Sequence, residues 1–262
     1  MYKERFPDIS IIADGYTRPD DQAWVWRFMD LAKLISIIAT GTLHFVRLDE
    51  FHDPYEGFPP LGNRISESDL LDLPAEQRAA MVADSNRNTW NLAEKARQII
   101  FVNCWSVNEH ESAAMWKLYG SGSEGIAIRS NCGRLKNALS KALQAIDMAE
   151  VKYIDYQVAR VQTAPMDMLA LSMHKRKSFE HERELRVVHW DSTEAMDIIR
   201  GERQRNSKKL VPIQVDRDAL IERIFVSPTS PTWFKEVVES VLSKYGVNKQ
   251  VHRSSLEDGP VW

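Results

Sequence analysis

The segment from Glu182 to Trp190 alternates between two kinds of side chain, and this alternation constrains the fold more than any other feature of the chain. Glu182, Glu184 and Arg186 form one set, whereas the intervening set is apolar at its centre. Because neighbouring side chains of a β-strand point to opposite faces, the period of two predicts a strand with one charged face. Successive charges are then about 7 Å apart along the backbone. Either this face is solvated and ion-paired, or it lines a cleft in which Arg186 keeps one carboxylate ionised while the other acts.

The remaining patterns predict several further strands with helices between them. Apolar residues at helical spacing predict a first helix from Trp24 to Ile38, which ends at Gly41. The other helices are expected at 66–98 with a break near Pro74, and at 108–119, 134–148, 166–179 and 231–245. The other strands are expected at 42–47, 99–106, 124–129, 149–156, 224–226 and 250–252. We therefore predict an α+β fold with a mixed central sheet and helical insertions.

Length and composition indicate a conventional folded unit. The chain has 262 residues, of which 44% are hydrophobic and 27% charged, as in average globular proteins. We predict one elaborated domain over 1–262, with a helical insertion at 58–98. The longest apolar stretch, Leu31 to Ala39, is too short to span a bilayer, and the first residues lack the apolar run of a signal peptide. Cys104 and Cys132 are the only cysteines, which favours a reducing compartment, so we expect a cytoplasmic protein without membrane contact.

Charge and familiar motifs exclude several classes of function. A net charge of -3 argues against nucleic-acid binding through bulk positive charge and slightly favours small or neutral substrates. The sequence contains no G-x-x-x-x-G-K-[ST], no G-x-G-x-x-G after a strand, no H-E-x-x-H and no G-x-S-x-G. Nucleotide hydrolases of the P-loop type, Rossmann dehydrogenases, zinc proteases and α/β-hydrolases are therefore not favoured.

A polar cluster from Asn103 to Ser112 lies at the junction between the predicted strand 99–106 and the next predicted helix. Ser106 or Asn108 as a helix cap explains the cluster without any function. A helix N-terminus beside a strand end is equally suited to bind an anion, so a phosphate-bearing ligand fits this place. Trp105 fits a core or a cleft wall.

A second polar cluster extends from the predicted strand 42–47 into the loop after it, and it contains His44, Arg47, His52, Asp53, Pro54, Tyr55 and Glu56. A turn in which Asp53 caps the backbone and Pro54 fixes φ accounts for part of it. A metal site can also be drawn from its members His44, His52, Asp53 and Glu56. Their spacing matches no recognised set of metal ligands, so no metal is expected.

Three motifs together resemble a widespread bacterial family known as a domain of unknown function. They are Leu43-x-Phe45-x-Arg47-x3-Phe51-x-Asp53-Pro54-x-Glu56-Gly57, Cys104-Trp105-Ser106-x2-Glu109-x-Glu111-Ser112-x2-Met115-Trp116-x2-Tyr119 and Phe179-x2-Glu182-x-Glu184-x-Arg186. The resemblance extends from about Trp26 to the last predicted strand. The family name itself implies no activity.

A more distant resemblance is to ADP-ribosyltransferases of the Arg-Ser-Glu type, whose site holds an Arg, a Ser-containing triplet and Glu-x-Glu in that order on successive strands. It implies a split sheet and assigns roles by motif. Arg47 would hold a phosphate of NAD, Ser106 would brace the site, Glu184 would stabilise the positive charge on the nicotinamide ribose, and Glu182 would activate the acceptor. We also count Trp105 and Tyr119 with Arg47 and His44 as cofactor-binding candidates. The residues expected to support the site are Asp53, Glu56 and Arg186.

The sequence departs from that enzyme class in two places. The triplet is Cys104-Trp105-Ser106 where the class has Ser-Thr-Ser, and the helical insertion separates Arg47 from Ser106. A His-Tyr-Glu variant made of His44, Tyr119 and Glu184 stays open as an alternative. The Arg-Ser-Glu arrangement requires Arg47, Ser106 and Glu184 to converge on one cleft, because groups more than about 12 Å apart could not all contact one nicotinamide nucleotide.

The predicted function is that of an NAD-using ADP-ribosyltransferase-like enzyme, with NAD as substrate and a protein or nucleic acid of unknown identity as acceptor. The resemblance suggests a bacterial conflict or phage-defence effector with an operon-encoded partner. One rival is a metal-dependent nuclease or phosphodiesterase built from Asp53, Glu56, Glu182 and Glu184. The other is a non-catalytic module whose cleft senses a nucleotide or binds a partner.

Overall fold

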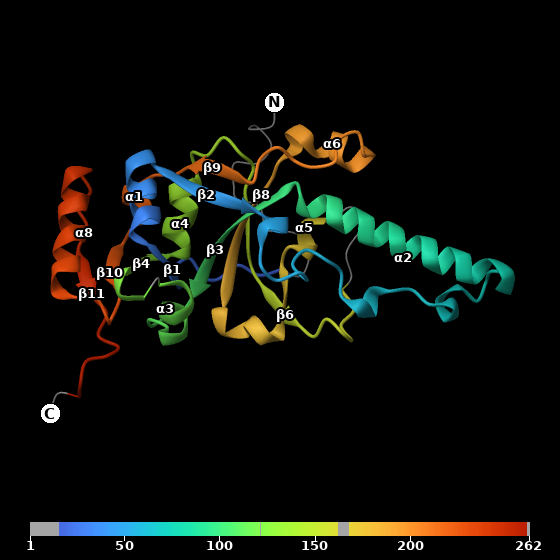
Figure 1. Ribbon diagram of the computed structural model, residues 1–262, viewed down its shortest axis with the longest axis horizontal. Coiled ribbons are helices and arrows are strands. Elements are labelled where there is room, and N and C mark those ends of the chain that lie inside the picture. Colours follow the sequence, from blue (N-terminus) through green and yellow to red (C-terminus); the bar gives the residue numbers. More distant parts are fainter. Residues whose placement is uncertain (1–15, 121, 162–167, 261–262) are drawn as a thin grey trace.

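A sheet that divides at its central strand organises the fold of this computed structural model, which describes residues 16–120, 122–161 and 168–260 (Figure 1). The central strand, β3 (Ile100–Val107), pairs along one edge with β8 (Glu184–Trp190) in antiparallel register. Its other edge is shared, because β2 (Thr42–Arg47) pairs with the beginning of β3 and β1 (Trp24–Asp30) with its end. The strands β1 and β2 therefore diverge from a common neighbour, and the sheet is split between them.

The sheet continues outward from each of these strands. Beyond β1 lie β4, β10 and β11, beyond β2 lies β9, and beyond β8 lies β5. Their bounds are β4 (Gly125–Asn131), β5 (Asp147–Glu150), β9 (Leu210–Gln214), β10 (Arg223–Val226) and β11 (Val251–Arg253). The pair β10 and β11 is parallel, whereas the other pairs described in this sheet are antiparallel. The predicted α+β class with a mixed sheet is confirmed.

One face of the sheet is covered by helices that build the main core. These helices are α1 (Leu31–Thr40), α4 (Cys132–Leu139), α7 (Arg217–Leu220) and α8 (Thr232–Lys244). Leu34 and Ile38 of α1 are fully buried in one cluster with Leu43 and Phe45 of β2. Each such side chain contributes roughly 1.5–3 kcal/mol when removed from water. This core fixes which face of β2 points away from the cleft described below.

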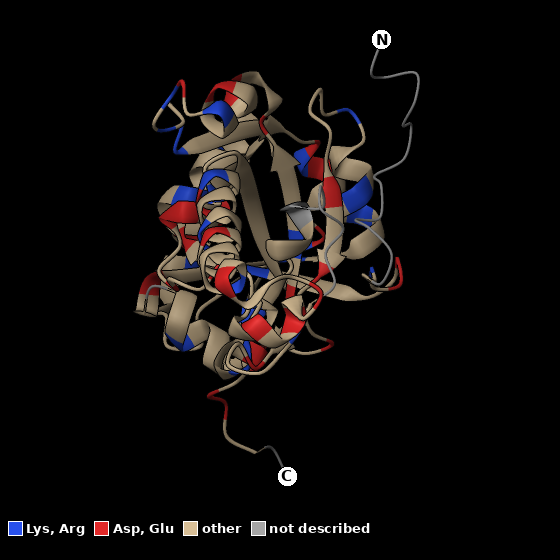
Figure 2. Ribbon diagram, turned by 90° about the vertical axis from the view of Figure 1, so that its right-hand side faces the viewer, with Lys and Arg blue, Asp and Glu red and all other residues tan. Residues whose placement is uncertain are grey.

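The other face of the sheet carries shorter elements and the predicted insertion. Two small helices, α3 (Ala113–Tyr119) and α5 (Met168–Leu171), lie on this side with a parallel strand pair, β6 (Lys152–Ile154) and β7 (His174–Arg176). A further helix, α6 (Ser192–Arg200), follows β8. Over the view in Figure 2, acidic and basic positions are interspersed. Across the described ranges, no helix is both long enough and apolar enough to cross a bilayer.

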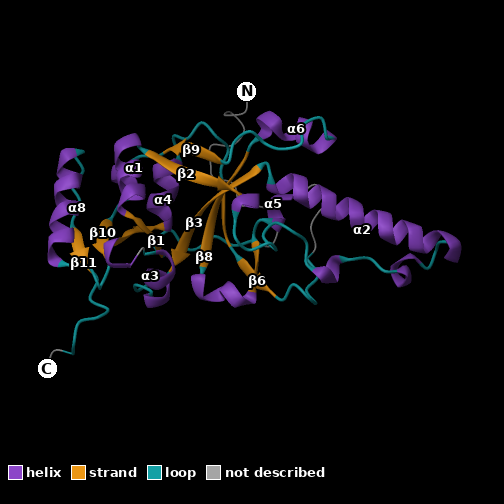
Figure 3. Ribbon diagram, viewed as in Figure 1, coloured by secondary structure: helices purple, strands orange, loops and turns teal. Residues whose placement is uncertain are grey.

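Residues 58–98 join β2 to β3 and contain α2 (Ala75–Arg97), which projects away from the sheet (Figures 1 and 3). The helix begins directly after Pro74, where the sequence predicts the break. Two short 3₁₀ helices, η2 (Leu61–Asn63) and η3 (Glu67–Leu70), precede it. Ala93 and Ala96 are the buried residues of α2, so the helix contacts the body of the protein only near its C-terminal end.

The structure corrects the first predicted helix, because Trp24 to Asp30 is a strand. Val25 and Met29 enter the main core, while Trp26 belongs to a cluster on the opposite face. This period of two outweighs the helical spacing of the same apolar residues. The helix starts only after Asp30, whose carboxylate caps it by accepting a hydrogen bond from the Lys33 backbone.

Other boundaries also differ from the prediction. The helix expected at 134–148 ends at Leu139, and the strand expected at 149–156 is divided into β5 and β6. The helix expected at 166–179 gives way to α5 and β7, and its first two residues lie outside the described ranges. Glu182 ends a 3₁₀ helix, η5 (Lys177–Glu182), and the left-handed Arg183 connects it to β8. The strand β9 and the helices α6 and α7 were not predicted, whereas the β-α-β ending is confirmed.

Candidate functional site

A cleft of about 340 Å³ opens beside the fork of the sheet. Its walls come from β1, β3 and β8, from α3 and η5, and from the segment 50–56 after β2. The predicted site residues that line it are Asp53, Glu56, Trp105, Ser106, Tyr119, Glu182 and Glu184. All three sequence motifs therefore contribute residues to one cleft.

Lys175 links the carboxylates of the cleft. Its ammonium lies 2.5 Å from Glu182 Oε2, 3.0 Å from Glu184 Oε2 and 3.5 Å from Glu56 Oε1. Lys175 projects from β7 and is 7% exposed, and its three partners are buried as well. A buried ammonium among three carboxylates fixes their positions, because each oxygen that it contacts would otherwise lose its hydration without compensation.

Arg186 is the second cation of this network, and it is fully buried. Its Nε donates to Glu184 Oε1 at 2.8 Å, its Nη2 lies 2.7 Å from Glu56 Oε2, and its Nη1 donates to the carbonyl of Ser172. The parity of β8 explains this arrangement, since Glu184 and Arg186 lie on one face and Leu185 on the core face. Three carboxylates and two cations leave the network with a formal charge of -1 when all five groups are ionised.

The network holds Glu184 in its charged form. Burial alone would raise the pKa of Glu184, but Arg186 and Lys175 together lower it from 4.5 to about 2. Burial raises the pKa of Glu56 despite the opposing effect of Arg186. Burial also disfavours the charged form of Lys175, yet Glu184, Glu56 and Glu182 raise its pKa above the ordinary value. Glu184 is therefore a permanent anion in the wall of the cleft at any physiological pH.

Glu182 is held by side chains from two other elements. Tyr119, at the end of α3, donates to Glu182 Oε1 at 2.8 Å, and Ser106 Oγ donates to the Glu182 carbonyl at 2.7 Å. The hydroxyl of Tyr153 accepts the backbone N–H of Glu184 at 2.7 Å. Ser106 therefore braces the chain between η5 and β8.

Arg27 is the cationic side chain at the fork itself. Its Nη1 donates to Asn103 Oδ1 at 2.6 Å and to the Cys104 carbonyl at 2.9 Å, and its guanidinium lies 5.8 Å from the Trp105 ring centroid. Asn103 also donates from Nδ2 to the His44 carbonyl, so it connects β1 with β2 across the split in the sheet. In the described part of the chain no carboxylate lies within 4 Å of Arg27. It is thus a cleft cation without an acidic partner.

Arg47 does not face the cleft, and the expectation that it would do so is corrected. It has the parity of Leu43 and Phe45, which point into the main core, and it is fully buried. All five of its N–H groups are occupied by the carboxylates of Asp49 and Glu50 and by the carbonyls of 206 and 208. A guanidinium with no remaining donor cannot also bind a phosphate. Arg47 instead ties the end of β2 to the segment before β9.

The other predicted residues take up supporting positions. The Asp53 carboxylate pairs with Arg176 at 2.9 Å and also accepts from the Tyr55 backbone, as the predicted turn requires. His44 is half-buried and does not line the cleft, so the structure does not join it to Tyr119 and Glu184. Among the described residues no group of three or more His, Cys, Asp or Glu side chains is arranged to hold a metal ion. Lys175 lies where the three carboxylates of the cleft come together.

Sequence reasoning missed Lys175 and Arg27, the two cations that define the cleft. Lys175 lies in a segment that was predicted as a helix, and that prediction did not place its side chain near the carboxylates. Arg27 stands in the strand that was also predicted as helix. The alternation of Val25, Arg27 and Met29 with two aromatic residues was the available signal for a strand.

Comparisons with known proteins agree with the motif resemblance over part of the chain. Residues 115–187 match the model of a family described as "Protein of unknown function (DUF2971)". The predicted resemblance to a domain of unknown function is confirmed there. This stretch contains Tyr119, Lys175, Glu182, Glu184 and Arg186.

No curated protein matches the sequence. Two solved structures of Thermus sp. 2.9 DarT are similar to the chain. The complex with carba-NAD+ is 10% identical, with a TM-score of 0.37, and the match covers 90% of this chain and 96% of that chain. The complex with NAD+ is also 10% identical, with a TM-score of 0.38, and the match covers 91% and 98%.

The lowered pKa of Glu184 predicts how acid affects stability. A carboxyl whose pKa is lower in the folded chain contributes stability above its unfolded pKa, and this contribution is lost as the pH falls toward the folded pKa. The difference in unfolding free energy between the wild type and Glu184→Gln should therefore be constant near neutral pH. Below about pH 4.5 it should shrink, by at most about 1.4 kcal/mol per pH unit.

Urea denaturation at several pH values measures this difference. The exposed Glu180 on η5 is not a member of the buried network, so Glu180→Gln is the matched control for the removal of one carboxylate. A difference that grows as the pH falls would contradict the assigned charge state of Glu184.

Proposed function

We propose that the chain is an NAD-consuming enzyme that breaks the bond between nicotinamide and ribose and transfers the ADP-ribosyl group to an acceptor. The observation that carries the proposal is that buried carboxylates and a cation that is not paired with them line one cleft. Two buried carboxylates, Glu182 and Glu184, line the same cleft as Arg27, a cation without an acidic partner. Such a cleft suits a ligand that has a phosphate at one place and develops positive charge at another.

The chemistry requires one bond to break and one to form. As the bond from ribose C1′ to the pyridine nitrogen breaks, its electron pair leaves with nicotinamide, which becomes neutral. The positive charge moves onto the ribose, where the permanent anion Glu184 stabilises it. The acceptor oxygen or nitrogen then bonds to C1′ and releases its proton. We assign the uptake of that proton to Glu182, which stands beside Glu184 and is held by Tyr119.

Arg27 replaces Arg47 as the proposed phosphate-binding residue. Its Nη1 is fixed by Asn103 and Cys104, and the residue lines the cleft. Trp105 lies against this guanidinium and restricts its position. We also propose that Trp105 and Tyr119 contribute apolar surface to the nucleotide site. We propose that Asp53, Glu56 and Arg186 hold the residues of this nucleotide site in position.

The direct test is incubation of the purified chain with NAD labelled in its adenylate part, alone and with a cell lysate. The expected result is release of nicotinamide, together with labelled ADP-ribose or a labelled macromolecule. Unchanged NAD with no labelled product from any fraction of the lysate would contradict the proposal. A role as a cytoplasmic phage-defence effector with an operon-encoded partner belongs to the same proposal, and NAD depletion in cells that produce the chain would support it.

Arg27→Gln is expected to raise the KM for NAD by about tenfold or more, with a smaller change in kcat. A charge-assisted contact with a phosphate that does not react contributes to the ground state and the transition state alike. Steady-state kinetics over a range of NAD concentrations measures this. The matched control is Lys117→Gln, an exposed cation on α3 outside the cleft lining. An unchanged KM in a folded Arg27→Gln chain would remove Arg27 from the proposed site.

The rival metal-dependent nuclease would require the same carboxylates to bind a metal ion. A divalent ion would need oxygens that Lys175 already contacts at 2.5, 3.0 and 3.5 Å. We therefore expect NAD turnover to survive an excess of chelator. Loss of activity on chelation, with recovery on adding a divalent metal, would favour the nuclease or phosphodiesterase instead.

A second candidate function is supported by the closed ion network. Both carboxylates already have cationic partners, which suits a cleft that binds a nucleotide and does not turn it over. A rise in melting temperature with NAD, without any release of nicotinamide, would favour this sensing module over the enzyme.

A further inference from the structure

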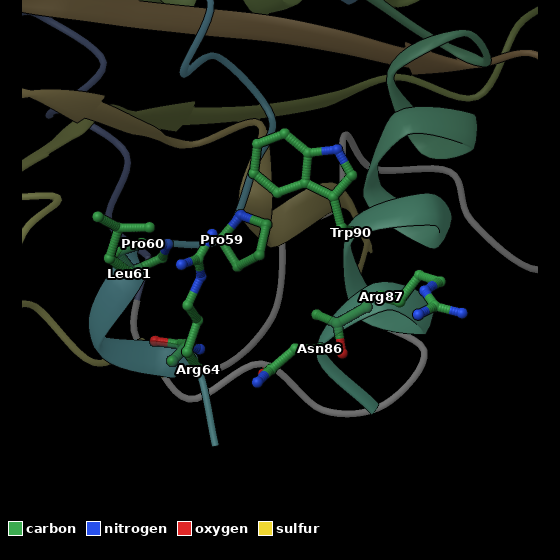
Figure 4. Close-up of a pocket in the computed structure, with 9 residues that line it drawn as sticks. Pro59, Pro60, Leu61, Arg64, Asn86, Arg87 and Trp90 are labelled. Atoms are coloured by element: carbon green, nitrogen blue, oxygen red, sulfur yellow. The ribbon is translucent and has the colours of Figure 1, made fainter. Parts of the chain in front are cut away.

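A second cavity, of about 330 Å³, lies within the helical insertion and not in the cleft of the split sheet (Figure 4). One wall is the segment 59–64, with Pro59, Pro60 and Leu61, and the other is the part of α2 from 86 to 90. Neither wall contributes to the cleft with Glu184. Segment 58–98 therefore carries a pocket of its own.

The walls of this cavity are fixed by side-chain clamps on the backbone. The Asn86 amide exchanges two hydrogen bonds with the backbone of Ile65, at 3.0 and 2.9 Å. The Asn63 amide does the same with the backbone of Val161, at 2.7 Å for both bonds. The loop is thereby attached to α2 on one side and to the segment after β6 on the other. A pocket whose walls are already ordered loses little conformational entropy on binding.

Three planar groups, from Arg97, Phe58 and Trp90, stack in a row that ends at this cavity. The Arg97 guanidinium lies 4.5 Å from the Phe58 ring centroid, and the Phe58 and Trp90 rings stack at 4.1 Å with an interplanar angle of 17°. Trp90 is the last member, and it is 45% exposed although one of its faces is covered. In Figure 4 its indole borders the cavity above Pro59. The open face of the indole is suited to receive one more planar ring.

The charge of the lining favours an anion. Among the residues that the structure describes, it includes Arg64 and Arg87 but no Asp or Glu. Arg64 has no carboxylate within 4 Å in the described part of the chain, and its side chain rises along the apolar wall in Figure 4. Arg87 points away from the cavity in the same view, and its ion pair with Asp84 is long, at 3.7 Å. Arg64 is therefore the cation available to a ligand in this pocket.

We propose that this cavity binds a nucleotide, with its base stacked on Trp90 and its phosphate held by Arg64. The observations behind it are the open ring at the end of a stack, the cation without an acidic partner and the ordered walls. The base and its phosphate come either from a free nucleotide or from a residue of a single strand. Stacking of a base on an aromatic side chain suits both sources. The site is separate from the cleft and does not depend on NAD turnover.

Isothermal titration calorimetry with the full chain tests the proposal. The probes are AMP, adenosine, ribose 5-phosphate and a six-residue single-stranded oligonucleotide. Titrations use the Arg27→Gln background, in which nucleotide binding in the cleft is expected to be weaker. AMP is expected to bind more tightly than adenosine or ribose 5-phosphate, because only AMP has both the base and the phosphate. Tighter binding of the oligonucleotide than of AMP would support the single strand as the source, and the reverse order the free nucleotide.

Variants assign the binding to this cavity. Trp90→Ala should weaken AMP binding at least tenfold, Trp90→Phe should restore part of it, and Arg64→Gln should affect AMP but not adenosine. Trp233→Ala on α8 is the matched control, because Trp233 is 54% exposed and distant from the insertion in sequence. Equal affinity for AMP with and without Trp90→Ala would overturn the proposal, as would the absence of binding by both AMP and the oligonucleotide. Neither result would affect the NAD assay, so failure of this site and failure of the proposed enzyme are distinguishable.

Discussion

Replacing Glu184 by glutamine is expected to lower kcat for NAD turnover by about 10²- to 10³-fold, the effect of removing one group aimed at charge that develops in a transition state. The change removes one negative charge and keeps the shape of the side chain. Glu184 is the carboxylate of the cleft whose pKa is lowered to about 2, so the variant removes a charge that is always present in the wild type. Nicotinamide release under saturating NAD measures the effect.

The same substitution also leaves Arg186 with fewer anionic partners, so folding must be measured beside activity. Circular dichroism and thermal melting of Glu184→Gln separate loss of catalysis from loss of structure. Glu180→Gln on η5 is the control, because Glu180 is exposed and does not line the cleft. Turnover at the wild-type rate by a folded Glu184→Gln chain would exclude the proposed role of Glu184.

Glu182→Gln tests whether the two carboxylates differ in role. If Glu182 takes up the proton of the acceptor, its loss should reduce transfer to a macromolecule more than release of nicotinamide. Equal loss of both reactions would place Glu182 with Glu184 in the cleavage step.

Short runs of apolar and β-branched residues in the sequence predicted the strands best. β2 was predicted with its bounds, and β3 and β10 to within one residue at each end, because buried apolar residues mark them clearly. Trp24 to Asp30 failed, because both faces of β1 are lined by large apolar residues and the same residues also fit a helical period. The pairing of β1 with β3 and β4 decides between the two periods.

The carboxylates of the site were predictable, whereas the partners that decide their chemistry were not. Glu184 and Arg186 share a strand, so their proximity follows from a period of two. Lys175 reaches the same carboxylates from β7 only because β6 and β7 pair beside the sheet. Arg47 shows the converse limit. Its position in the motif suggested that it binds a phosphate. However, Arg47 lies on the same face of β2 as Leu43 and Phe45, and this face points away from the cleft.

Arg186→Met is expected to reduce the free energy of unfolding by about 3–5 kcal/mol, the usual cost of removing one member of a buried ion pair. The variant leaves Glu184 and Glu56 in a buried place, where only Lys175 still balances them. It also leaves the Ser172 carbonyl without the guanidinium that donates to it. Methionine fills much of the same volume, so the loss arises from uncompensated charge more than from a cavity. Urea denaturation at neutral pH measures it.

Compensating substitutions distinguish this cause from a simple packing defect. Adding Glu56→Gln and Glu184→Gln to Arg186→Met removes the uncompensated charges, so the triple variant should be more stable than Arg186→Met alone. A packing defect would instead persist in the triple variant. Arg200→Met, at the exposed end of α6, should change stability by no more than about 0.5 kcal/mol. If Arg186→Met cost no more than that control, the buried network would have no part in holding η5, β7 and β8 together, and the fixed position of Glu184 would need another cause.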